Sequence, residues 1–329
     1  MAALTCTDQQ SLTVVSYGGG VYQESHIQAF VVPFEETYNV KVQAESWNAN
    51  LTELRKRVTT GDPVWQVVEV TDAQFRQGLR EGLFENLSVP AQGDFLAGTR
   101  HQRGIANIYW GTVLAFDPED FHEGKMPTRW RDFWDVINFP GARGLQDDPR
   151  GTLEFALLAD GIPIEALYPL DVDRAFRKLD ELKPHITEWW KEGGEAIEAL
   201  TSNRVQLTSA WNGRVFAARR KGSRIAYSWH EAALDLDWWV VPRGTRNRKL
   251  ASEFIAFAST AGRQADLAQR VGYGPVNLDA LRLLPPEVRE ELPTYRLNWE
   301  KAFIMSSDWW SIHEEEMADR WKDWRSRGG

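Results

Sequence analysis

The sequence predicts an α/β fold divided into two lobes. Strand-like apolar runs alternate with helical runs along the whole chain, the pattern of mostly parallel sheets flanked by helices. The length of 329 residues fits one large domain or two ordinary ones. Extended segments near Trp110 and Asp237 provide two places where the chain can cross from one lobe to the other. We therefore expect residues 1–112 with 237–285 in one lobe, and 113–236 with 286–329 in the other.

Alternation is clearest in the first third of the chain. Strands are expected at 12–16, 40–44, 65–70 and 105–116, and helices at 22–38 and 72–81. Gly18, Gly19 and Gly20 end the first strand, and Gly82 ends the second helix.

The rest of the chain continues with more helix. In the segment 171–182 the apolar residues follow a helical period, and Pro184 ends the run. Further helices are expected at 153–159, 196–200, 215–220, 250–259, 262–271 and 309–325, and strands at 205–211 and 236–241.

Composition limits the possible partners. There are 38 Lys and Arg against 47 Asp and Glu, a net charge of −9, which argues against nucleic acid because neutralising phosphates needs a basic face. No stretch approaches 18 apolar residues, so we expect a soluble chain. The single cysteine, Cys6, excludes an intrachain disulfide. We expect it to be an inert thiol, and the alternative is the remnant of a lipid-attachment site.

Common catalytic motifs are incomplete or missing. Gln23 stands where a dinucleotide-binding glycine motif would need its third glycine, and neither a phosphate-binding loop nor a nucleophile elbow occurs. None of the six histidines has metal-ligand spacing: His26, His101, His122, His185, His230 and His313. We expect no enzyme, no cofactor and no metal.

Three local patterns could contact a ligand. The first is the glycine loop at 18–20, where a strand leads into a helix start and leaves backbone N–H groups for an anion or carbonyl. Gly19 and Gly20 are the candidate ligand-binding glycines, and Tyr17, immediately before the glycines, would wall the same space. A tight turn without a ligand explains the glycines equally well.

The second pattern is Trp211-Asn212-Gly213-Arg214. A strand end would supply an aromatic wall, Asn-Gly would turn the chain, and the Arg214 guanidinium in the first helical turn could clamp a carboxylate. An exposed surface charge is the alternative for Arg214.

The third pattern combines acids with indoles around 229–239. With a strand period of two, Asp235, Asp237 and Trp239 share one face. Asp237 lies in an otherwise apolar strand, where a buried carboxylate needs a partner such as a ligand cation, or a structural Arg or Lys.

Several segments in order resemble the spermidine/putrescine-type periplasmic solute-binding proteins that serve ATP-driven importers. The resemblance runs from about Leu12 to Trp324 and includes TVVSYGGGVYQ, WQVVEV, YWGTVLAF, NFPGARGLQDDPRGTLEFALLADG, TSAWNGRVFAARRKG, DLDWWVVPRGTRN and RVGYGPVN. It implies the two-lobe periplasmic-binding-protein fold, type II, with solute held as the lobes close, and no enzymatic activity.

The resemblance also assigns positions in the site. Aromatic side chains stack on the methylene chain of polyamines, and carboxylates hold the amines. The matching positions here are Tyr17, Asp148, Trp211, Asp237 and Tyr273, with Trp110 as a weaker aromatic candidate.

Two departures change the expected ligand. Gly151 replaces the second acid of the loop that contains Asp148, and Arg214 replaces a small residue after Trp-Asn-Gly. Losing an anion and gaining a cation disfavours a polyamine and favours a carboxylate or a zwitterion. We expect a small amino acid with separated charges, of the γ-aminobutyrate (GABA) kind, or another small carboxylate. Arg214 would hold its carboxylate and Asp237 its amine.

The sequence is also compatible with other functions. An unmodified polyamine binder is the nearest alternative, and a carbohydrate-active enzyme with paired carboxylates is a remote one. A ferric-ion binder would show adjacent tyrosines, and the sequence has no Tyr-Tyr pair. We expect a monomer that delivers its ligand to the membrane permease of an ABC transporter, located in the periplasm or anchored at the cell surface.

Sixteen tryptophans are far more than a chain of this length usually contains. Most are expected in the packing of helix-rich segments: Trp130, Trp134, Trp189, Trp190, Trp299, Trp309, Trp310, Trp321 and Trp324. Trp211 is the one expected at the ligand, with weaker candidates at Trp47, Trp110, Trp229, Trp238 and Trp239.

Overall fold

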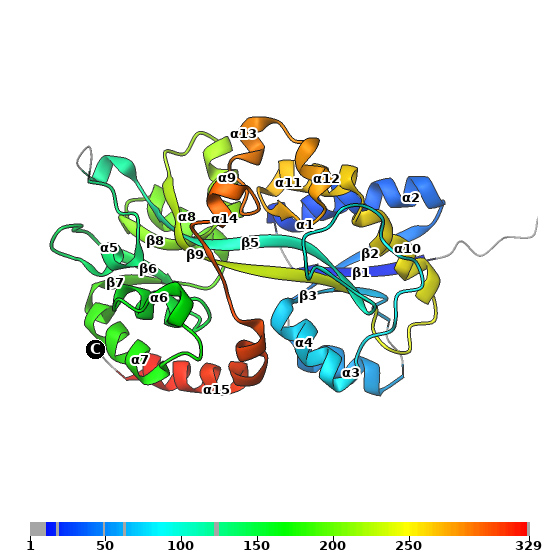
Figure 1. Cartoon of the computed structure of the whole chain (residues 1–329), viewed down its shortest axis with the longest axis horizontal. Helices are drawn as coiled ribbons and strands as arrows, with labels where there is room; N and C mark the ends of the chain where they lie inside the picture. The colour runs from blue at the N-terminus through cyan, green and yellow to red at the C-terminus, as the bar shows by residue number, and fades with distance from the viewer. Residues whose placement is uncertain (1–10, 18–19, 49, 62–63, 122–124, 328–329) are drawn as a thin grey trace, which may run out of the picture. The chain divides into compact units, whose positions relative to one another are not determined.

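The computed structural model describes residues 11–17, 20–48, 50–61, 64–121 and 125–327 (Figure 1). The chain divides into two compact units. The first contains residues up to Ile108 together with Leu236–Arg270 and Pro275–Pro285, and the second contains Tyr109–Asp235, Val271–Gly274 and the segment from Pro286 onward. The turn at Val271–Gly274 thus packs in the second unit, whereas the sequence prediction placed it in the first lobe. Each unit is described by itself below.

The sheet of the first unit is built on β1 (Ser11–Tyr17), which pairs in parallel with β2 (Lys41–Trp47) and β3 (Val67–Thr71). On its other side, β3 pairs antiparallel with the final residues of β9 (Ala226–Val240). β1 is buried from Leu12 to Ser16, as expected for a strand with helices on both faces.

Helices cover both faces of this sheet (Figure 1). One face carries a continuous helical segment made of α1 (Gly20–His26), a π-helical turn (Ile27–Val31) and α2 (Val32–Tyr38), with α10 (Arg248–Ala258) beside it. The opposite face carries α3 (Leu51–Thr59) and α4 (Asp72–Glu81). α4 starts at a capping box formed by Thr71 and Gln74 and stops at Gly82, whose φ of 66° is readily adopted only by glycine.

Strands of the second unit pair both in parallel and antiparallel. β5 (Gly104–Phe116) pairs antiparallel with β8 (Leu207–Trp211), while β6 (Arg143–Gln146) pairs in parallel with both β8 and β7 (Ile186–Trp190). α8 (Gly193–Thr201) and α9 (Asn212–Arg220) cover one face, and α6 (Thr152–Ala159), α7 (Val172–Leu182) and α15 (Ser307–Ser326) cover the other (Figure 1).

Short elements complete the described chain. The strands are β4 (Arg100–His101), β10 (Gly274–Pro275) and β11 (Phe303–Ile304). The helices are α5 (Trp130–Trp134), α11 (Ala261–Val271), α12 (Leu278–Arg282), α13 (Pro286–Arg289) and α14 (Arg296–Trp299), with 3-10 turns at Pro118–Asp120, Ile164–Ala166 and Lys183–His185.

The predicted α/β class is confirmed, and two local expectations are corrected. The helix expected at 22–38 contains the π-helical turn, and the strand expected at 236–241 is the end of a 15-residue strand that starts at Ala226. Trp189 and Trp190, expected in the packing of helix-rich segments, lie in β7, a short strand that was not predicted. β7 was missed because the segment between Pro184 and the glycines at 193 and 194 is too short to show a strand-like alternation of apolar and polar residues.

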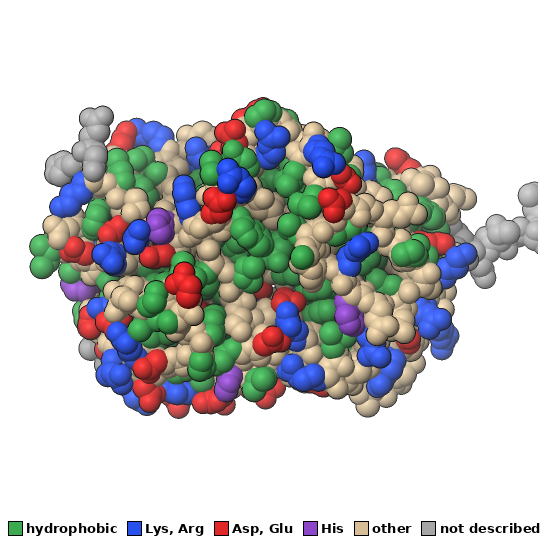
Figure 2. All heavy atoms as spheres, in the orientation of Figure 1, with side chains coloured by type: hydrophobic (Ala, Val, Ile, Leu, Met, Phe, Trp, Pro, Cys, Tyr) green, Lys and Arg blue, Asp and Glu red, His purple; other side chains and the backbone are tan. Residues whose placement is uncertain are grey.

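The face of the molecule drawn in Figure 2 carries charges of both signs. Figure 2 shows Lys and Arg interspersed with Asp and Glu over the face drawn, without a continuous basic patch. In the described part of the chain, no helix is long and apolar enough to cross a membrane.

Candidate functional site

Three parallel strands of the second unit end at one edge of its sheet. β7, β6 and β8 lie side by side in the same direction, so the segments that follow Trp190, Gln146 and Trp211 emerge together. Each segment then leads into a helix, α8, α6 or α9. Ligands of open α/β sheets bind at such carboxyl-terminal edges, where helix N-termini also present backbone N–H groups.

Trp211 ends β8 at this edge and is surrounded by indoles. The Trp110 ring, from β5, lies 6.1 Å from it and the buried Trp190 ring lies 5.4 Å from it, both edge to face. The Trp211 residue is half-buried, yet its Nε1 is fully buried and, among the described residues, has no hydrogen-bond partner. A buried indole N–H usually has an acceptor, so this donor is suited to a ligand oxygen.

Asn212 and Gly213 fix the backbone beneath Trp211. Asn212 Oδ1 accepts from the backbone N–H of Gly111 at 2.9 Å, and its Nδ2 donates to the carbonyl of Gly272 at 2.8 Å. A Cβ on Gly213 would lie 2.5 Å from the Tyr273 ring and 2.6 Å from the carbonyl oxygen of Val271. The Trp-Asn-Gly sequence therefore joins three segments of the second unit, a structural role beyond the turn that the sequence indicated.

Arg214 stands in the first turn of α9, which is an unfavourable place for a cation. The helix dipole places partial positive charge at this end, and the first turn of α9 contains no acidic residue. The side chain is half-buried, and its Nε is buried without a hydrogen-bond partner in the described structure. Gly193, the first residue of α8, packs against the rings of Trp211 and the aliphatic part of Arg214. An anion at this point would be stabilised by both the guanidinium and the helix dipole.

Asp148 belongs to the loop between β6 and α6. Its Oδ1 accepts from the backbone N–H of Arg150 at 2.8 Å. Burial raises the pKa of Asp148 to about 6, although the hydrogen bond from Arg150 and its charge act in the opposite direction. The carboxyl group of Asp148 therefore titrates close to neutral pH.

Arg150, which the sequence analysis overlooked, is the second cation at this edge. One of its terminal nitrogens lies 2.6 Å from Asp235 Oδ2, and the two side chains are 14% and 1% exposed. Asp235 thus neutralises Arg150, while Arg214 has no ion pair among the described residues. The sequence contained a weak indication of this pair, because a buried acid in an apolar strand needs a cation.

The other acids around this loop are bound to α15. Asp147 Oδ1 accepts from Trp321 Nε1 at 3.0 Å and from Arg325 Nε at 2.8 Å. Glu154 Oε1 accepts from Trp310 Nε1 at 2.7 Å, and Glu154 Oε2 accepts from the backbone N–H of Gly151 at 3.0 Å. The loop that contains Asp148 is therefore fixed on both sides by carboxylates bonded to indoles.

Tyr273 lies close to the same segment. It is 8% exposed, and its ring edge contacts Gly213, which directly precedes Arg214. Five of the predicted site residues thus belong to the second unit: Trp110, Asp148, Trp211, Arg214 and Tyr273. Trp110, Trp211, Arg214 and Tyr273 are connected by the contacts described above, and Asp148 lies in the loop after the neighbouring strand β6.

The remaining predicted residues belong to the first unit. Tyr17 ends β1 and its ring stacks parallel to that of Trp47, with centroids 6.5 Å apart. Gly20 begins α1 with a φ of 59°, and a Cβ there would meet open space. Asp237 is 3% exposed in β9, opposite Thr71 of β3. Gly19, like Cys6, lies outside the described residues.

The weaker tryptophan candidates of the first unit have structural partners. Trp47 Nε1 donates to the carbonyl of Glu69, and Trp238 Nε1 donates to Asp72. Trp239 is fully buried and packs against the rings of His26, Phe30 and Phe254, although its Nε1 has no hydrogen-bond partner among the described residues. Trp229, in the second unit, is 8% exposed and packs edge to face with Tyr227. These contacts explain all four residues as packing.

The described residues contain no group of three or more His, Cys, Asp or Glu that could hold a metal ion. What the second unit offers instead is two buried N–H donors, the indole of Trp211 and the guanidinium of Arg214, together with aromatic walls. Such an arrangement can bind an anion and exclude water from it.

Comparisons with known proteins identify the family of this chain. Residues 29–294 match the family model described as bacterial extracellular solute-binding protein. A γ-aminobutyric acid-binding protein of Pseudomonas aeruginosa is 39% identical, covering 99% of this chain and 94% of that protein. The spermidine/putrescine-binding periplasmic protein of Escherichia coli is 23% identical and covers 80% and 78%.

A solved structure of an ABC transporter component has the same fold. An ABC transporter substrate-binding protein from Bradyrhizobium japonicum is 33% identical and superposes with a TM-score of 0.90, covering 96% of this chain and 99% of the other. Because both the family model and the 39%-identical relative cover most of the sequence, the chain belongs to the bacterial extracellular solute-binding proteins, which capture small molecules for ABC transporters and are not enzymes.

Proposed function

We propose that this protein binds a small amino acid with a separated carboxylate and amine, GABA or a close analogue. One observation carries the proposal: Trp211 Nε1 and Arg214 Nε are two buried donors without partners in the described structure, at the start of one helix. A carboxylate has the acceptor geometry and the charge that these groups require. The 39%-identical relative, named as a γ-aminobutyric acid-binding protein, supports the same ligand class.

The charges of the site argue against a polyamine. Arg150 is paired with Asp235, so the Arg214 guanidinium is the unneutralised cation at this edge in the described structure. A polyamine would place a further cation beside it and would leave both donors without an acceptor. Asp237 remains the proposed acceptor for the ligand's amine.

Replacing Arg214 tests the proposal directly. Arg214→Ser should weaken GABA binding by at least 100-fold, because removing one partner of a buried charge pair costs roughly 3–5 kcal/mol. The measurement is isothermal titration calorimetry on the purified protein. Arg219→Ser is the matched control, since Arg219 lies on the same helix but pairs with Glu291 at 3.1 Å. Unchanged affinity in Arg214→Ser would sink the assignment, and so would a wild-type preference for putrescine.

We also infer that the protein works as a monomer, in the periplasm or anchored at the cell surface. The extracellular description of the family supports the location. Light scattering coupled to size exclusion tests the oligomeric state, and a dimer that persists at low concentration would contradict it.

A further inference from the structure

A single buried carboxyl group contacts both β1 and α1. Glu69, in β3, is 0% exposed. Its carboxyl group receives a hydrogen bond from the backbone N–H of Tyr17, the last residue of β1. Its Oε1 accepts from the Tyr22 hydroxyl at 2.9 Å and from Asn107 Nδ2 at 2.7 Å. Tyr22 lies on the first turn of α1, so Glu69 bonds both the end of β1 and the start of α1.

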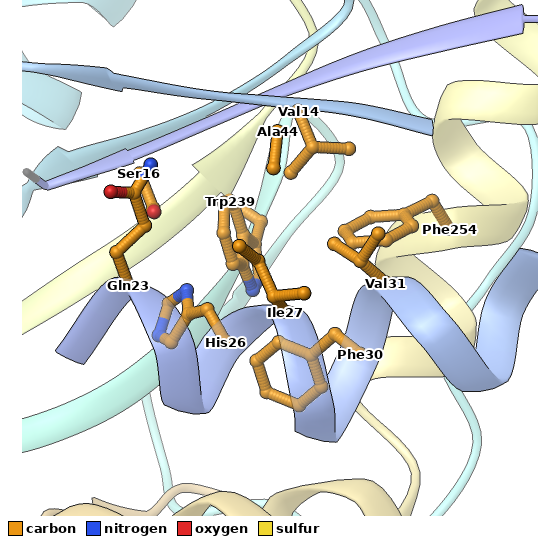
Figure 3. Close-up of a pocket in the computed structure, with 10 residues that line it drawn as sticks. All are labelled: Val14, Ser16, Gln23, His26, Ile27, Phe30, Val31, Ala44, Trp239 and Phe254. Atoms are coloured by element: carbon orange, nitrogen blue, oxygen red, sulfur yellow. The ribbon is translucent and has the colours of Figure 1, made fainter. Parts of the chain in front are cut away.

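The surroundings of Glu69 are apolar and aromatic. Trp239 is its direct neighbour on β9, and His26 of α1 lies with its Nδ1 3.9 Å from Glu69 Oε2. His26 and Trp239 both line a small cavity of about 10 Å³ in this unit (Figure 3). Glu69 Oε2 and both ring nitrogens of His26 are buried without hydrogen-bond partners within the described residues.

Both titratable groups are affected by this burial. Burial raises the pKa of Glu69 to about 7, against the opposing effects of its hydrogen bonds from Asn107, Tyr22 and Tyr17. Burial lowers the pKa of His26 to about 3, so His26 is uncharged near neutral pH and does not neutralise Glu69.

Glu69 is also a close neighbour of Asp237. In the β3–β9 register Thr71 is opposite Asp237 and Glu69 is opposite Trp239. Side chains alternate along a strand, so Glu69 and Asp237 share one face as diagonal neighbours, roughly 7–8 Å apart at the backbone. The titratable groups around Glu69 are thus Tyr22 and His26 from α1, Tyr17 from β1 and Asp237 from β9.

We propose that Glu69 is a positioning residue of the ligand site: it holds Tyr17 in place and releases its proton to solvent when an ammonium group binds at Asp237. This inference rests on the proposed function, because it takes Asp237 as the acceptor for the amine. The added positive charge favours ionised Glu69, and the three donors from Tyr17, Tyr22 and Asn107 are already arranged to stabilise the ionised form. A merely structural carboxyl group would not link ligand binding to protons.

The test is the pH dependence of GABA affinity, measured by calorimetry at pH 5.5, 7.0 and 8.5 in buffers of different ionisation enthalpy. In the wild type the Kd should fall roughly 3- to 10-fold from pH 5.5 to 8.5, with release of about 0.3–0.4 proton per ligand at pH 7. Glu69→Gln should lose both the pH dependence above pH 6.5 and the proton release. Glu45→Gln is the control, since Glu45 is a half-buried carboxylate of the same unit that accepts from Trp65 Nε1 at 2.8 Å.

Two further measurements make the outcome decisive. Tyr22→Phe removes one donor that stabilises ionised Glu69, so it should move the midpoint of the affinity profile to higher pH. This variant tests the proposal even if Glu69→Gln fails to fold. Asp148→Asn removes any contribution of Asp148 to the pH dependence of affinity, and the pKa of Asp148, about 6, lies below that of Glu69, about 7. A wild-type profile that is flat, or a Glu69→Gln profile that keeps the wild-type slope, overturns the proposal. If putrescine binds with the same proton release and GABA does not, the inference about Glu69 stands and the proposed function falls.

Discussion

Many of the surplus tryptophans hold the fold together through their indole N–H groups. Five donate to carboxylates, in the pairs Trp65–Glu45, Trp238–Asp72, Trp310–Glu154, Trp321–Asp147 and Trp324–Asp180. Hydrogen bonds to charged groups are stronger than neutral ones, and each also satisfies a carboxylate that would otherwise be poorly solvated. These five tryptophans are therefore packing residues whose N–H groups also stabilise partly buried carboxylates. Trp211 differs from these five because its donor has no partner in the described structure.

Removing one of these donors should measurably destabilise the second unit. Trp321→Phe keeps an aromatic ring but leaves Asp147 without the indole donor, and it should lower the free energy of unfolding by about 1–3 kcal/mol. Trp189→Phe is the control, because its ring lies 5.8 Å from Trp321 in the same cluster and its N–H has no hydrogen bond to another described residue. Equal losses for the two variants in urea denaturation would show that ring volume, rather than the hydrogen bond, carries the effect.

At the scale of elements, close approach between the start of α9 and the Gly-Tyr turn shapes the site. Gly213 lets Tyr273 and Val271 contact the α9 backbone, and Gly272, with a φ of 69°, lets the turn pack on Phe216. Asn212 joins the same turn to β5. Together these residues determine the direction in which Arg214 leaves its helix.

A methyl group at Gly213 should disturb this contact. Gly213→Ala should cost about 1–3 kcal/mol of stability and weaken ligand binding, since the new Cβ would overlap the Tyr273 ring and a backbone oxygen. Gly194→Ala, in the first turn of α8, meets nothing within 4 Å and should be tolerated or slightly stabilising. Thermal unfolding and calorimetry of both variants provide the comparison, and an undisturbed Gly213→Ala would contradict the packing role.

Elements with strong local patterns were predictable from the sequence. α4 was predicted at its observed bounds, because a capping residue and a glycine mark its ends, and α7 was predicted to within one residue. α3 and β7 were not, because α3 lies in a polar stretch and β7 is short. The Arg150–Asp235 pair joins residues 85 positions apart, and Glu69 gained its importance from a strand register. Neither the ion pair nor the strand register can be predicted from the spacing of neighbouring residues in the sequence.

At the scale of the whole molecule, buried titratable groups make stability depend on pH. Glu69 and Asp148 have raised pKa values, about 7 and about 6, so the folded state keeps their protons after the unfolded chain has lost them. Their contribution to stability is present at low pH and is lost as pH rises from about 4 to about 7. His26, with its pKa lowered to about 3, acts oppositely, and its contribution is lost as pH falls below about 6.5.

We therefore expect the unfolding free energy to fall between pH 5 and pH 7.5, since two acids outweigh one histidine in that range. Glu69→Gln should reduce this fall by on the order of 2–3 kcal/mol, and His26→Gln should steepen it below pH 6.5. Urea denaturation at several pH values measures both effects. Wild-type stability that increases steadily from pH 5 to pH 7.5 would refute this account of the first unit.

The central claim is that the ligand carries both a carboxylate and an amine. Calorimetric titration of the wild-type protein with GABA, butyrate and putrescine tests it most directly, because the last two each keep only one kind of charged group. We predict that GABA binds at least 100-fold more tightly than either of the others. Equal or tighter binding of putrescine would contradict the claim, and so would equal binding of butyrate.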